Sequence, residues 1–109
     1  MNENVKNELD RIVSVLTGTG IVSRIFLFGS YATGEEAVGS DIDLCVLTPV
    51  KDRNPIDITV DLRARLYGVK TMALDLFTCN QDTFFNRAAY AGSLEHEIAK
   101  HGVTLYEHK

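Results

Sequence analysis

Residues 28–44 read FGSYATGEEAVGSDIDL, and this stretch places a glycine–serine pair ten residues ahead of an Asp-x-Asp sequence. Gly29 and Ser30 directly follow a run rich in β-branched and aromatic residues, and Asp41 and Asp43 begin the next apolar run. Successive side chains of a strand point to opposite faces of the sheet, so Asp41 and Asp43 are expected to share one face. The stretch therefore predicts a strand, a turn, and a second strand that begins with two carboxylates on one side.

A third aspartate lies in an apolar run farther along the chain. Asp75 stands between Leu74 and Leu76 in the predicted strand 71–79, and strand alternation places it on the face opposite these leucines. If the two strands are neighbours, Asp75 joins the first pair. Three carboxylates on one surface repel one another, and such an arrangement is expected where a divalent cation lies between them.

Carboxylate oxygens are ligands suited to Mg²⁺ or Mn²⁺, which also take oxygens from substrate phosphates. Two such ions can hold the attacking and the leaving oxygen of a phosphoryl transfer. Gly29 allows the backbone to approach a phosphate closely, and the Ser30 hydroxyl can donate to a phosphate oxygen. Each motif alone is common in turns or on exposed surfaces, but their joint placement favours a functional acidic site that binds a nucleotide.

The remaining residues alternate between helical and strand patterns. Helices are predicted for a first segment that ends at Gly18 and Gly20, and for residues 55–67, 81–90 and 94–100; strands are predicted for 21–28, 42–47, 71–79 and 103–106. This order indicates an α/β or α+β fold, with a small β-sheet flanked by helices, and leaves the strand directions open. With 109 residues, the chain is expected to form one domain over 1–109.

Composition limits the classes of function. The chain is 45% hydrophobic and 24% charged, which is typical of a globular protein, and it has no membrane-length apolar run or secretory leader pattern. A soluble, cytoplasmic protein is therefore expected. The net charge of -4 argues against broad nucleic-acid binding, although bound cations would still admit a nucleotide. Cys45 and Cys79 are isolated in apolar runs and are expected to be buried, reduced thiols.

Taken together, Gly29-Ser30, the ten intervening residues, Asp41-Ile42-Asp43 and the later Asp75 resemble the nucleotidyltransferase superfamily related to DNA polymerase β. The small size of the chain suggests the minimal branch of this superfamily, the MntA-type antitoxins that pair with HEPN-domain (HepT) toxins. The resemblance implies a polymerase β-like fold with a mixed sheet. It also implies that Gly29 and Ser30 contact the triphosphate, that Asp41, Asp43 and Asp75 bind metal, and that Asp75 assists the attacking hydroxyl.

The activity implied by this resemblance is Mg²⁺-dependent transfer of AMP from ATP to a tyrosine of a cognate HEPN toxin. Thr33 departs from the family pattern, in which many members carry arginine at this position. Two alternatives stay open: an antitoxin that neutralises its toxin by binding alone, and a nucleotidyltransferase that modifies a small molecule such as an aminoglycoside. A chain of this length has no room for a separate acceptor-binding domain, so the acceptor is expected to come from another chain.

Overall fold

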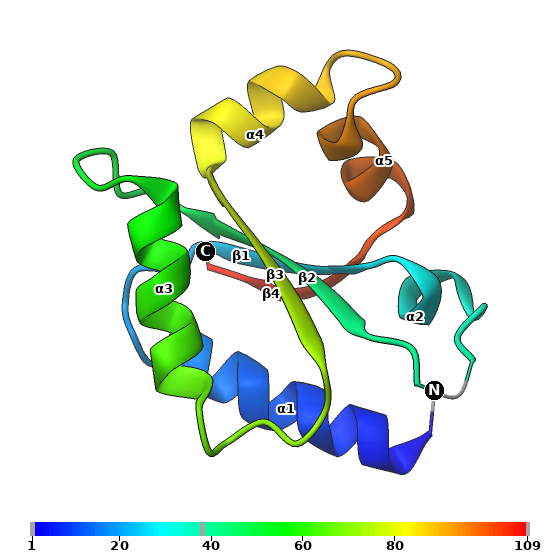
Figure 1. The fold of residues 1–109 in the computed structure, drawn as a ribbon. Helices are drawn as coiled ribbons and strands as arrows, with labels where there is room; N and C mark the ends of the chain where they lie inside the picture. Colours follow the sequence, from blue (N-terminus) through cyan, green and yellow to red (C-terminus); the bar gives the residue numbers. More distant parts are fainter. Residues whose placement is uncertain (1, 38, 109) are drawn as a thin grey trace.

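The computed structural model describes residues 2–37 and 39–108. Its sheet consists of four strands, β1 (Arg24–Phe28), β2 (Ile42–Thr48), β3 (Leu74–Asn80) and β4 (Val103–Glu107), in the spatial order β3-β2-β1-β4 (Figure 1). β1 runs antiparallel to both β2 and β4, whereas β2 and β3 are parallel. The small sheet flanked by helices that the sequence predicted is confirmed, and its strand directions are mixed, as the family resemblance implied.

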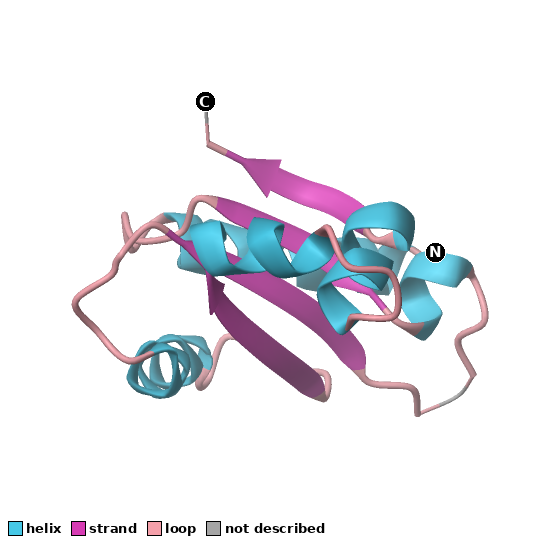
Figure 2. Ribbon diagram, turned by 90° about the horizontal axis from the view of Figure 1, so that it is seen from above, coloured by secondary structure: helices cyan, strands magenta, loops and turns pink. Residues whose placement is uncertain are grey.

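Helices cover both faces of the sheet. The helices α1 (Glu3–Thr17) and α3 (Pro55–Leu66) lie on one side, and α4 (Gln81–Ala88) and α5 (Leu94–His101) lie on the other (Figures 1 and 2). The short α2 (Ser30–Thr33) follows β1 directly. Within the part of the chain that the structure describes, no helix has both the length and the apolar character needed to cross a membrane.

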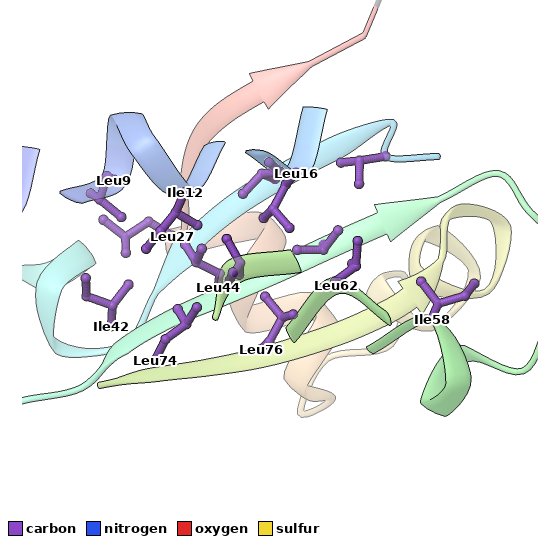
Figure 3. Close-up of a cluster of buried hydrophobic side chains, with 14 of the residues drawn as sticks. Leu9, Ile12, Leu16, Leu27, Ile42, Leu44, Ile58, Leu62, Leu74 and Leu76 are labelled. Carbon is purple, nitrogen blue, oxygen red and sulfur yellow. The ribbon is translucent and has the colours of Figure 1, made fainter. Parts of the chain in front are cut away.

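Two hydrophobic clusters hold these layers together. The larger lies between the sheet and the α1–α3 face, where Ile12, Leu44 and Leu62 are fully buried (Figure 3). The smaller lies on the α4–α5 face and includes Cys45 and Phe84. Cys45 and its neighbour in this cluster, Cys79, are buried free thiols, as predicted. Because side chains alternate along β2, Asp43 lies on the face opposite Leu44, which is the α4–α5 face.

The sequence signals for the helix ends are confirmed. The side chains of Asn54, Asn80 and Ser93 accept hydrogen bonds from backbone N–H groups at the starts of α3, α4 and α5. Gly68 follows α3 with a φ of +82°, a conformation that favours glycine. The third strand differs from the prediction, since it begins at Leu74 rather than at residue 71.

A buried glutamate explains the later start of β3. Glu8 of α1 is 1% exposed and accepts hydrogen bonds from the backbone N–H groups of Thr71 (2.6 Å) and Met72 (2.7 Å), which are therefore occupied outside the sheet. It also pairs with Arg11 at 2.6 Å. Burial raises the pKa of Glu8, but the hydrogen bonds outweigh burial, and the net pKa is lowered from 4.5.

Replacing Glu8 by glutamine is expected to lower the free energy of unfolding at neutral pH by about 2 kcal/mol, because charge-assisted hydrogen bonds become neutral ones. Since the pKa of Glu8 in the folded state lies below 4.5, the advantage of the wild type is complete above that pH. It is lost as the pH falls through the folded-state pKa. Urea unfolding of both proteins at several pH values measures this difference; Asp10→Asn, at an exposed position of α1, is the control and should show no comparable loss.

Candidate functional site

The strand register brings two of the three predicted aspartates together. Asp43 is the direct partner of Phe28 across the antiparallel β1–β2 pair and of Asp75 across the parallel β2–β3 pair. Asp43 and Asp75 therefore lie side by side on the α4–α5 face, as expected if the two strands are neighbours. Asp41 precedes β2 and is exposed, but its negative charge still acts on Asp43.

Gly29 touches this carboxylate pair from the end of β1. Its φ of +74° and ψ of -155° lie in a region of backbone conformation that is essentially restricted to glycine. A Cβ at this position would overlap Oδ2 of Asp43 and would lie only 3.1 Å from its Cγ. The absence of a side chain at residue 29 therefore lets the backbone pack directly against the Asp43 carboxylate, which is a sharper requirement for glycine than the sequence alone indicated.

The electrostatic environment of Asp43 is unfavourable to its charged form. Burial raises the pKa of Asp43, and the negative charges of Asp75 and then Asp41 raise it further, together with the hydrogen bond that a protonated Asp43 carboxyl donates to Asp75. The exposed faces of Asp41 and Asp75 leave the cluster open to solvent on one side. A cation placed there would relieve the repulsion among the three carboxylates.

The donor set fits Mg²⁺, which binds through one or two carboxylates and completes its shell with water and phosphate oxygens rather than requiring a closed protein cage. Over residues 2–37 and 39–108, no three histidine, cysteine or acidic side chains are arranged so that they could hold a metal ion by themselves. Asp43 and Asp75 are adjacent and Asp41 is exposed nearby, so an ion placed here would have to take further ligands from water or from a substrate. Among the described residues, His96, His101 and His108 form no such group with one another.

Ser30 is the first residue of α2 and lies beside Gly29, so the structure keeps the predicted glycine–serine pair next to Asp43. Tyr31 packs against the larger hydrophobic cluster. Two basic residues elsewhere in the chain are occupied by ion pairs: Arg65 with Asp61 at 3.2 Å and Arg87 with Glu95 at 2.8 Å. Neither ion pair involves Asp41, Asp43 or Asp75.

A cavity of about 210 Å³ adjoins the site between α2 and α5. Its lining comes from the end of β1 and from both helices: Phe28, Gly29, Ala32, Thr33, Leu94, Glu97, Ile98, His101 and Gly102. The sequence did not predict this cavity, because its two walls are separated by some sixty residues and neither contains a recognisable motif. Gly29 contributes to both the cavity and the aspartate cluster.

Comparison with protein families found a match to the model described as "Polymerase beta, Nucleotidyltransferase", over residues 10–109. The matched residues include all the predicted site residues. Comparison with curated protein sequences found no match.

Several solved structures share the fold. A chain of a mutant MntA–HpeT toxin–antitoxin complex superposes with a TM-score of 0.63 and 21% identity, over 100% of this chain and 76% of that chain. A chain of a toxin–antitoxin structure with AMP-PNP gives 0.56 and 22%, over 94% and 75%. A complex of a tri-AMPylated Shewanella oneidensis HEPN toxin with its MNT antitoxin gives 0.54 and 19%, over 94% and 71%. At these identities, the likeness establishes a common fold.

Proposed function

Because the chain belongs to the Polymerase beta nucleotidyltransferase family, we propose that it transfers AMP from ATP to a hydroxyl group, with Asp41, Asp43 and Asp75 as the catalytic centre. The main support is the contact of Gly29 with the Asp43 carboxylate, beside the aligned Asp75. This arrangement places the glycine–serine turn, suited to phosphate, against the carboxylates, suited to Mg²⁺.

The proposed reaction is a single displacement at phosphorus. The acceptor oxygen forms a bond to the α-phosphorus of ATP, the bond from that phosphorus to the α–β bridging oxygen breaks, and pyrophosphate leaves with the electron pair. The proton of the acceptor hydroxyl passes to a carboxylate oxygen of Asp75, which is exposed and can return the proton to solvent. The products are AMP esterified to the acceptor and free pyrophosphate.

Each site residue has a defined part in this step. Asp41, Asp43 and Asp75 would hold Mg²⁺, which when bound neutralises phosphate charge and orients the reacting oxygens. Gly29 keeps the backbone close enough for a phosphate to approach, and the Ser30 hydroxyl donates to a phosphate oxygen. Asp43 lies between Gly29 and Asp75 and so links the phosphate turn to the residue that receives the proton.

We propose that the acceptor is a tyrosine of a HEPN-domain toxin and that the chain is an antitoxin. The support is the likeness to the chains of toxin–antitoxin complexes, one with AMP-PNP and one with a tri-AMPylated HEPN toxin. The open, exposed site at the sheet edge suits an acceptor presented by a second protein rather than a small molecule enclosed by this chain.

The test is incubation of the chain with ATP, Mg²⁺ and a HEPN-domain protein as candidate partner, followed by intact mass measurement of both proteins. A gain of AMP on the partner supports the proposal, and chelation of Mg²⁺ should abolish this gain. Partner binding without any mass gain would instead support an antitoxin that acts by covering its toxin.

Asp75→Asn distinguishes these two modes of action. We expect this variant to bind the partner normally and to transfer AMP at least about 10²-fold more slowly, because it loses both a metal ligand and the proton acceptor. Protection of a host from the toxin should disappear with the transfer. Full protection by an inactive Asp75→Asn variant would contradict an enzymatic antitoxin.

A further inference from the structure

The cavity between α2 and α5 is large enough for one ring system. Its volume of about 210 Å³ is smaller than the several hundred Å³ typical of sites that enclose a whole ligand. Its floor is apolar, with Phe28 and the buried Ile98, and its rim includes the exposed Leu94. A flat ring that stacks on apolar and aromatic surface fits this floor.

The polar groups at the rim select a particular ring edge. Glu97 and His101 are one turn apart on α5, with the His101 Nε2 3.6 Å from the Glu97 Oε2, and both line the cavity. Glu97 offers an acceptor and His101 offers a ring nitrogen donor. Adenine presents a matching pair on its N6–N7 edge, an amino donor next to a ring acceptor, whereas the same edge of guanine presents two acceptors. Guanine would therefore place its O6 against the Glu97 carboxylate.

We propose that this cavity binds the adenine ring of the donor nucleotide and that Glu97 and His101 determine the preference for ATP over GTP. This inference rests on the proposed nucleotidyltransferase function and adds the base-recognition site to it. Gly29 connects the two parts, because it lines the cavity and also touches Asp43. Figure 1 shows that α2, which forms one wall, begins where β1 ends, so the ring and the phosphates of one nucleotide meet at this strand end.

The experiment measures binding of Mg²⁺ complexes of ATP, GTP and inorganic tripolyphosphate to the full chain by calorimetry, without the partner protein. We expect ATP to bind about tenfold or more tightly than either GTP or tripolyphosphate, since a matched pair of base contacts discriminates to that extent. Leu94→Trp, which fills the cavity from its exposed rim, should reduce ATP affinity to that of tripolyphosphate and leave tripolyphosphate binding unchanged. Glu97→Ala should bring ATP and GTP affinities close together.

A second cavity-filling variant and a control variant complete the experiment. Thr33→Phe fills the same cavity from α2, so it should reproduce the effect of Leu94→Trp even if one substitution disturbs its own helix. Val60→Trp adds the same bulk at a 63% exposed position of α3, on the far face of the sheet, and should bind ATP like the wild type.

Equal affinity of the wild type for ATP and tripolyphosphate, or normal ATP binding by both filled variants, would overturn the inference and leave the proposed function intact if AMP is still transferred. If the wild type binds ATP, both cavity-filling variants lose this binding, and AMP is transferred to no partner, the result would support the inference and count against the proposed function. An absence of ATP binding overturns the inference.

Discussion

Asparagine in place of Asp43 is expected to slow AMP transfer by about 10³-fold or more without lowering the stability of the fold. Asp43 is the aspartate in contact with both the Gly29 turn and Asp75. In the proposed function Asp43 binds Mg²⁺, and loss of that ligand removes several kcal/mol of charge stabilisation in the transition state, at about 1.4 kcal/mol for each factor of ten in rate.

Stability is expected to move in the opposite direction from activity. Asp43 is partly buried beside two other carboxylates, and burial and these charges raise its pKa. An amide of the same shape removes a charge that the fold alone does not favour. In the absence of divalent ions, the Asp43→Asn variant should therefore unfold at the same temperature as the wild type or at a higher one.

Thermal unfolding with and without Mg²⁺, together with the rate of AMP transfer, measures both effects. Added Mg²⁺ should stabilise the wild type more than Asp43→Asn, because the proposed function makes Asp43 one of the ligands of the ion. Asp52→Asn, at an exposed position in the loop before α3, is the matched control and should change neither property. A variant at residue 43 that is clearly less stable but fully active would show that Asp43 has a structural role instead.

The face on which Asp75 lies could be predicted from the sequence because it follows from a short-range rule. Alternation along a strand assigned Asp75 to the face opposite Leu74 and Leu76, and the structure confirms this assignment. The pairing of Asp43 with Asp75 required neighbouring, in-register strands, which no local pattern reports. The parallel β2–β3 pair supplied that information.

Features that depend on contacts between distant segments were not predictable. The first residues of the expected third strand are bound by Glu8, some sixty residues away, and nothing in the sequence near residue 71 indicates this. The cavity beside Gly29 likewise depends on how α5 returns to the end of β1 before β4. The sequence predicted that Gly29 belongs to a phosphate-binding turn, but not that Asp43 occupies the space of its missing side chain.

That contact makes Gly29→Ala the second variant with a large expected effect. The backbone at residue 29 costs a non-glycine residue about 1–3 kcal/mol, and the new Cβ would overlap the Asp43 carboxylate. Either the backbone or Asp43 has to move. We expect AMP transfer to fall by about 10²-fold or more, since a displacement of about 1 Å at a reacting centre has that effect.

Gly34→Ala separates backbone strain from the overlap with Asp43. Gly34 also has a positive φ, +79°, but a Cβ there would meet no atom within 4 Å among the described residues. This control should lose about 1–2 kcal/mol of stability, as expected for a left-handed residue, and should keep its activity. Chemical unfolding and AMP transfer, measured for both variants, give the comparison. Equal activity of the two variants would show that the Gly29–Asp43 contact has no catalytic importance.

A double variant tests the contact itself. Asp43→Ala removes the carboxylate that a methyl group at residue 29 would overlap and leaves only the Asp43 Cβ position, at an ordinary distance of 3.4 Å. Gly29→Ala should therefore destabilise the Asp43→Ala protein less than it destabilises the wild type, with a coupling energy of about 1 kcal/mol or more. Additive effects would mean that the whole cost of Gly29→Ala is backbone strain. A measured coupling would show that glycine at this position is required by the carboxylate as well as by the turn, and that the phosphate turn and the aspartate cluster form one structural unit.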